Sequence, residues 1–114
     1  MGNVILVVDK KEDIYFKILN YLKESKKKII LLGFPKNQEE EREHWHFLFS
    51  LCEKLECEKV PFSVGMEKGS LFNILELAKT ISAELIILPK RKFLLLGEEY
   101  EDFLKELEIP ILIY

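Results

Sequence analysis

Val4-Ile5-Leu6-Val7-Val8 is an uninterrupted apolar run near the start of the chain, and it ends at the acidic residue Asp9. Successive side chains of a strand point to opposite faces of a sheet, so an unbroken apolar run predicts a strand that is buried on both faces. Ile29-Ile30-Leu31-Leu32 has the same character. The two runs therefore predict parallel strands with helices packed on each side of the sheet.

Three further runs rich in Val, Ile and Leu extend this pattern. The five predicted strands are Asn3–Val8, Lys28–Phe34, Lys59–Val64, Glu84–Leu88 and Ile109–Tyr114. Pro61 interrupts the third run, which favours a sheet edge for that strand because proline has no amide hydrogen to donate. Segments with helical spacing separate the runs, and this alternation predicts a doubly wound, five-stranded parallel α/β sheet. We expect a single domain spanning residues 1–114.

The helices between these strands are predicted from apolar residues three and four positions apart. Their predicted buried faces are Ile14, Ile18, Tyr21 and Leu22; Trp45, Leu48, Cys52 and Leu55; Leu71, Ile74, Leu75, Ala78 and Ile81; and Tyr100, Phe103, Leu104 and Leu107. Asp13 is a candidate N-cap for the first helix. Glu39-Glu40-Glu41 would complement the N-terminal dipole of the second helix, and Gly69-Ser70 would form the turn before the third.

The composition excludes several classes of partner. A net charge of −3 over 114 residues gives no basic surface of the kind that binds nucleic acid or anionic membranes, and we expect neither partner. The apolar runs are far shorter than the roughly 20 residues that span a bilayer. We therefore expect a cytoplasmic protein with Cys52 and Cys57 as free thiols. The abundance of Lys and Glu beside a single glutamine, Gln38, is a bias seen in hyperthermophile proteins.

Several motifs, most of them in the C-terminal half, occur in a familiar order. They are Val64-Gly65, Ile74-Leu75-x-x-Ala78-Lys79, Ala83-Glu84-Leu85-Ile86-Ile87-Leu88, Leu94-Leu95-Leu96-Gly97 and Ile109-Pro110-Ile111-Leu112-Ile113, with Val7-Val8-Asp9 at the front. In order and spacing these motifs resemble the universal stress protein family over most of the chain. The resemblance implies the strand order 3-2-1-4-5 with helices on both faces. It also implies a homodimer in which Ile109–Tyr114 pairs with its twin, and a role in stress response or regulation.

A ligand of such a sheet binds beyond the carboxyl ends of the strands where the strand order reverses, here between the first and fourth strands. The candidate binding residues are Asp9, Lys10, Gly33, Phe34, Pro89, Lys90, Arg91, Lys92 and Gly97. The three successive cations would pair with phosphate oxygens of ATP or another adenine nucleotide. The resemblance places Asp9 near the nucleoside. The alternatives are a solvated basic turn for the cations and capping of loop amides for Asp9.

The loop after the fourth predicted strand departs from the family pattern. ATP-binding universal stress proteins carry G-x2-G-x9-G-[S/T] there, because backbone N–H groups must approach the phosphates without an intervening Cβ. In this chain Pro89 takes the place of the first glycine, the next glycine is Gly97, and Glu98 replaces the Ser or Thr. The nucleotide-binding loop is therefore degenerate, and we interpret Gly97 as closing a turn ahead of the last helix.

The segment 8–14 also resembles the opening of a response-regulator receiver domain. A receiver needs a carboxylate cluster for magnesium and a phosphate-accepting Asp at the end of its third strand. Lys10 stands where another acid is expected, and Val64-Gly65-Met66 ends the third predicted strand. Phosphorylation is therefore not expected. Strand order separates the two folds, because a receiver has its third strand in the centre of the sheet and a universal stress protein its first.

His44-Trp45-His46, together with Cys52 and Cys57, raises the question of a metal site. Helix residues two apart point in different directions, and no paired C-x2-C spacing is present. We therefore predict no metal site, place both histidines on the far side of the fold from the crevice, and interpret Trp45 as a core or interface anchor.

Catalysis is not expected either. Ser63, Ser70 and Ser82 have no histidine or carboxylate partner in a known nucleophile motif, and no P-loop or G-x-G-x-x-G sequence is present. The leading hypothesis is a small non-catalytic module that forms a homodimer and acts through a protein partner. The alternatives are a stress protein with an altered nucleotide or phosphate site, and a receiver-like domain without phosphorylation.

Overall fold

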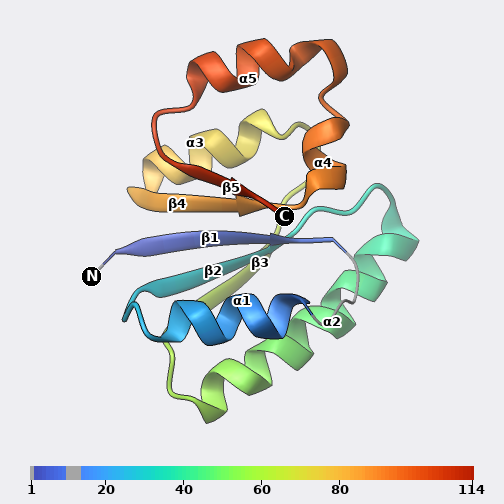
Figure 1. Cartoon of the computed structure of the whole chain (residues 1–114). Helices are drawn as coiled ribbons and strands as arrows, with labels where there is room; N and C mark the ends of the chain where they lie inside the picture. The colour runs from blue at the N-terminus through green and yellow to red at the C-terminus, as the bar shows by residue number, and fades with distance from the viewer. Residues whose placement is uncertain (1, 10–13) are drawn as a thin grey trace.

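The computed structural model describes residues 2–9 and 14–114 and contains one parallel sheet between two layers of helices (Figure 1). Within these residues the strands are β1 (Asn3–Val8), β2 (Lys28–Gly33), β3 (Phe62–Met66), β4 (Ala83–Leu88) and β5 (Ile111–Ile113). They pair in the order β3-β2-β1-β4-β5, and every neighbouring pair is parallel. This confirms the predicted fold. It also excludes the receiver arrangement, because β1 and not β3 occupies the centre.

The helices divide between the two faces of the sheet. On one face lie α1 (Ile14–Lys23) and α2 (Gln38–Cys57), and on the other lie α3 (Phe72–Thr80) and α5 (Tyr100–Glu106) (Figure 1). Between β4 and α5 the chain forms the short helix α4 (Lys90–Leu94) and the 3-10 turn η1 (Gly97–Glu99). The sequence interpretation gave this segment as a loop, and the helical conformation of α4 is a correction that bears on the site.

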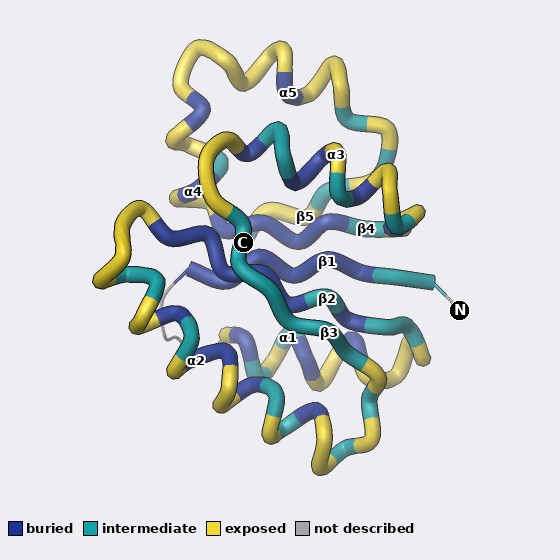
Figure 2. Tube along the Cα trace, turned by 180° about the vertical axis from the view of Figure 1, so that it is seen from behind, coloured by how far each residue is buried: buried dark blue, intermediate teal, exposed yellow. Residues whose placement is uncertain are grey.

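Two apolar cores follow from the alternation of side chains along β1. Val4, Leu6 and Val8 pack on the α1 and α2 side, whereas Ile5 and Val7 pack on the α3 and α5 side. Figure 2 shows the buried residues concentrated along the central strands and on the inward sides of the helices. The continuous apolar run at 4–8 is therefore explained by burial on both faces.

The predicted buried face of α1 is right at Leu22 but wrong at Ile14 and Tyr21. The buried residues are Tyr15, Leu19 and Leu22, whereas Ile14 is exposed and Tyr21 is 80% exposed. Tyr15 takes the inward position because its hydroxyl accepts a hydrogen bond from the Asp9 amide at 2.8 Å, which satisfies its polar end inside the core. The predicted N-cap, Asp13, lies outside the described residues.

Helix α2 buries Leu48 and Leu55 as predicted, but the rest of its buried stripe differs from the prediction. Its buried residues are His44, Phe47, Leu48, Leu51 and Leu55. Trp45 and Cys52 lie at the margin, partly buried against the same core. Trp45 stacks on the exposed ring of Phe49, with ring centroids 5.8 Å apart. The helix is rotated so that His44 faces inward, which the apolar pattern alone did not indicate.

The start of the third strand and the buried face of α5 differ from the prediction. The third strand begins at Phe62 and not at Lys59, because Lys59 adopts a φ of 58° and the Val60 amide bonds back to the Leu55 carbonyl to close α2. In α5 only Phe103 is buried, and its ring lies between those of Phe72 and Phe93. Of the other residues predicted for this buried face, Tyr100 and Leu104 are exposed and Leu107 is half-buried.

No helix in the described part of the chain combines the length and apolarity needed to cross a membrane.

Candidate functional site

Asp9 follows the central strand β1 and is buried at the carboxyl edge of the sheet. Its Oδ2 forms an ion pair with Arg91 Nη2 at 2.8 Å, and its Oδ1 lies 3.6 Å from Lys92 Nζ. The structure therefore brings Asp9 together with two of the three predicted cations, across the point where the strand order reverses between β1 and β4.

Lys92 has a different role from the phosphate partner predicted for it. The residue is 1% exposed, and its Nζ lies 3.3 Å from Glu40 Oε1 and 5.8 Å from the centre of the Phe34 ring. A buried ammonium is stable only beside opposite charge, and Asp9 and Glu40 supply it. Lys92 is therefore an internal counter-ion, not a solvent-facing anion contact.

Because α4 is helical, the side chains of the three predicted cations point in different directions. Successive helix residues point about 100° apart, so Lys92 turns inward while Arg91 reaches Asp9 from the rim. Lys90 is exposed, and its amide donates to the Tyr114 carbonyl at the end of the neighbouring strand. Of the predicted basic triplet, Arg91 alone lines the pocket described below.

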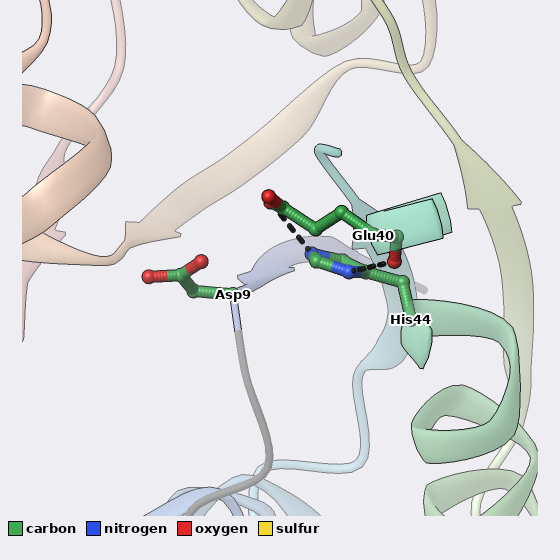
Figure 3. A group of neighbouring side chains, drawn as sticks. All are labelled: Asp9, Glu40 and His44. Carbon is green, nitrogen blue, oxygen red and sulfur yellow. Dashed lines mark hydrogen bonds and ion pairs between the residues drawn. The ribbon is translucent and has the colours of Figure 1, made fainter. Parts of the chain in front are cut away.

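Helix α2 contributes two groups, Glu40 and His44, that the sequence interpretation did not assign to the site. Asn37 caps the helix by accepting from the Glu40 amide at 2.8 Å, and the first turn of the helix brings Glu40 close to Asp9. Glu40 and His44 are four residues apart and share one face of the helix. Both ring nitrogens of His44 face Glu40: Nδ1 donates to the Glu40 carbonyl at 2.7 Å, and Nε2 lies 3.9 Å from Glu40 Oε1 (Figure 3).

The expectation that both histidines lie far from the crevice is therefore wrong. Potential ligand atoms of Asp9, Glu40 and His44 all lie within 4.8 Å of one another. In the described residues neither Cys52 nor Cys57 belongs to this group; burial, and secondarily the charge of Glu56, raises the pKa of the Cys52 thiol. The Glu40-x-x-x-His44 spacing was the available sequence signal, and it was missed because only histidine and cysteine spacings were considered.

A pocket of about 570 Å³ opens beside this group. It is lined by Asp9, Glu40, Glu43, His44, His46, Phe47, Ser50 and Arg91. Its volume lies within the range of about 300–1,000 Å³ that small-molecule sites occupy. Three carboxylates and one guanidinium line it, so an anionic ligand needs Arg91 or an added cation to bind there.

The remaining predicted residues have packing roles or fall outside the pocket. Gly33 is buried at the end of β2, where an added Cβ would lie 2.5 Å from Met66 Sδ. Phe34 lies beneath Lys92, and the buried Pro89 precedes α4. Gly97 adopts a φ of 55° at the start of η1, which agrees with the turn interpretation. Lys10 lies outside the described residues.

Aromatic side chains connect the pocket with the last strand. The Phe47 ring on the pocket wall lies 5.1 Å from the Tyr15 ring, and Tyr15 meets the Tyr114 ring edge-on at 5.6 Å. The Tyr114 hydroxyl donates to the Val7 carbonyl of β1 at 2.6 Å, although Tyr114 itself follows β5. No sequence pattern indicated this contact across β4.

Comparison with solved structures gives the fold a name. A universal stress protein from Archaeoglobus fulgidus superposes with a TM-score of 0.73 at 17% identity, covering 99% of this chain and 93% of that chain. This is the universal stress protein fold. The A. fulgidus universal stress protein in complex with dAMP gives a TM-score of 0.72 at 15% identity, covering 99% and 97% of the two chains.

A further universal stress protein, in complex with cAMP, gives a TM-score of 0.69 at 15% identity, covering 99% of this chain and 95% of that chain. No protein-family model and no curated protein sequence matches the chain. In this chain the segment after β4, where the sequence pattern of ATP-binding members led us to look for a glycine-rich loop, forms α4 and holds Lys92 inside.

Proposed function

We propose that this protein is a non-catalytic regulatory module that binds an adenine nucleotide in the pocket between Asp9, α2 and α4. The position of the pocket carries the proposal, because it lies beyond the carboxyl ends of β1 and β4, where ligands of open α/β sheets bind. Universal stress proteins of the same fold in complex with dAMP and cAMP support the choice of ligand class.

The residues of the pocket suggest how the ligand is held. Arg91 is 58% exposed, so its planar guanidinium is accessible to a phosphate, which it would bind through two parallel hydrogen bonds. Phe47 offers an apolar surface for the base, and the Asp9 carboxylate would accept from a ribose hydroxyl. A monophosphate fits this charge pattern better than ATP, because Glu40 and Glu43 would repel further phosphates.

Replacement of Arg91 with glutamine tests the proposal. We expect AMP or cAMP to stabilise the wild-type protein by about 2.7 kcal/mol at 100 times the dissociation constant. R91Q should bind at least about tenfold more weakly, because it loses a charge-assisted contact of about 1.5–3 kcal/mol. Thermal unfolding and calorimetric titration measure both quantities. Mass spectrometry of the recovered nucleotide should show it unchanged, as a non-catalytic module requires.

Lys90→Gln is the matched control, because it removes an exposed cation from the same short helix, outside the pocket. Its affinity should stay within about twofold of wild type, as expected for a surface change away from the ligand. Equal losses in the two variants would mean that net charge, not the pocket, controls binding. No thermal shift at millimolar AMP, dAMP or cAMP would overturn the proposal.

A second candidate function is self-association through β5, as a homodimer that presents a surface to a protein partner. In the described sheet β5 pairs with β4 on one side, and its other edge has no strand beside it. Leu112 and Ile113 on this strand are exposed. An exposed apolar edge favours pairing with another strand, and a second copy of β5 would supply it through a two-fold axis.

Leu112→Glu tests this candidate. We expect light scattering to give the wild-type protein twice the molar mass of one chain. L112E should have the molar mass of a monomer, because two carboxylates would face each other across the paired strands. Leu95→Glu is the control, since Leu95 is similarly exposed but lies beyond α4. A wild-type monomer, or an L112E dimer, would contradict self-association through β5.

A further inference from the structure

We propose that Asp9, Glu40 and His44 form a binding site for a divalent transition-metal ion, with Zn²⁺ as the ion that best fits the donor set. The inference goes beyond nucleotide binding and does not depend on it. It begins with one nitrogen of a buried histidine.

His44 is 3% exposed, and its Nε2 has no hydrogen-bond partner among the described residues. The Nδ1 atom lies 2.7 Å from a backbone carbonyl, which can only accept, so Nδ1 carries a hydrogen. In the neutral ring the Nε2 lone pair then faces the Glu40 carboxylate. Two acceptors facing each other inside a protein are unfavourable, and a cation between them removes the conflict.

The same hydrogen bond is typical of metal-binding histidines. A ligating imidazole usually donates its other N–H to a carboxylate or a backbone carbonyl, which fixes the tautomer and the ring orientation. Here the Glu40 carbonyl orients the ring, while the Glu40 carboxylate lies on the side of Nε2 (Figure 3). One residue thus orients the histidine ligand and supplies a second ligand.

The distances between the three donor atoms must shorten modestly for the atoms to share one ion. They lie within 4.8 Å of one another, whereas donors about 2.1 Å from a tetrahedral ion are about 3.4 Å apart. Glu40 lies in the first turn of α2 with a quarter of its side chain exposed, so its carboxylate has room to rotate inward. Rotation of the Asp9 carboxylate away from Arg91 completes the set, and the fourth position opens to the pocket.

Lys92 already places a positive charge at this point. Its Nζ lies 3.3 Å from Glu40 Oε1 and 3.6 Å from Asp9 Oδ1, distances longer than a good charge-assisted hydrogen bond. The ammonium therefore competes with a metal ion for the same two carboxylates. One imidazole with two carboxylates favours Zn²⁺ over Mg²⁺ or Ca²⁺, which prefer oxygen ligands alone.

Zn²⁺ titration of chelator-treated protein at pH 7, without nucleotide, tests the site. We expect one equivalent to bind the wild-type protein, and His44→Gln to weaken binding by at least about 100-fold, as loss of a ligand should exceed loss of an outer partner. Cys57→Ser is the matched control, because Cys57 is an exposed potential ligand on the same helix and lies outside both the group of three donors and the pocket; its affinity should stay within about twofold of wild type. Retained binding in H44Q, or an equal loss in C57S, would overturn the proposal.

Lys92→Met provides a test that a folding defect cannot mimic. Removing the competing charge should raise Zn²⁺ affinity by at least about tenfold, because a like charge within a few ångströms of the ion opposes binding. Unchanged or weaker binding in K92M would overturn the site as described. Because the titration contains no nucleotide, a negative result here leaves the nucleotide proposal standing, and failure of AMP binding leaves this one standing.

Discussion

Replacing Lys92 with methionine is expected to lower the free energy of unfolding by about 2 kcal/mol at neutral pH. Methionine keeps most of the side-chain volume, but it leaves the carboxylates of the buried Asp9 and the partly buried Glu40 without their shared cation. The loss should be smaller than for a fully isolated pair, because Asp9 keeps Arg91 at 2.8 Å and solvent reaches Glu40. Urea unfolding measures the change.

Lys90→Met separates this effect from a general effect of charge. Lys90 is exposed on the same short helix, so the substitution should change stability by no more than about 0.5 kcal/mol. If K92M were as stable as the wild-type protein, the carboxylates would not need the ammonium, and Lys92 would not be the internal counter-ion that we describe. Added Zn²⁺ should restore part of the stability of K92M, since the ion would replace the missing charge.

Phe103→Ala should reduce stability more, by about 3–4 kcal/mol. Phe103 is 1% exposed and is the buried residue of α5, with the rings of Phe72 and Phe93 at centroid distances of 5.7 and 6.2 Å. Truncation leaves a cavity between α3, α4 and α5, and both neighbouring rings lose their partner. Thermal and urea unfolding of the variant measure the effect.

Leu104→Ala is the control for this helix. Leu104 was predicted to share the buried face of Phe103, but it is 44% exposed, so its truncation should cost less than about 1 kcal/mol. Similar losses in the two variants would mean that α5 packs with a different face inward. A small loss for F103A would mean that α5 contributes little to folding.

The layered fold was predictable because its decisive signal is local. Val4–Val8 and Ile29–Leu32 are apolar at every position, and only strands covered on both faces tolerate that pattern. Burial of these residues in two separate cores bears out the reasoning. Which side of each helix faces inward was less predictable: Tyr15 and His44 are polar-tipped residues, and the hydrogen bonds that accompany their inward positions, with the Asp9 amide and the Glu40 carbonyl, leave no mark in an apolar pattern.

The conformation of α4 illustrates a second limit. Five residues are too few for an apolar period to show, and Lys90-Arg91-Lys92 reads as an exposed turn. The segment is helical because tertiary partners hold it, with Lys92 against Asp9 and Glu40 and the Lys90 amide against Tyr114. The three donors of the metal proposal also come together only through tertiary contacts, because Asp9 lies far in sequence from the helix that carries Glu40 and His44.

The row of rings from Phe47 through Tyr15 to Tyr114 has a consequence for regulation. It joins a wall of the pocket to the residue that ends β5, and the Tyr114 hydroxyl fastens that end to the carbonyl of Val7. If a ligand in the pocket displaced Phe47, the contacts through Tyr15 would transmit that displacement to Tyr114 at the end of β5. Occupancy and self-association would then be thermodynamically linked, and each would change the equilibrium constant of the other by the same factor.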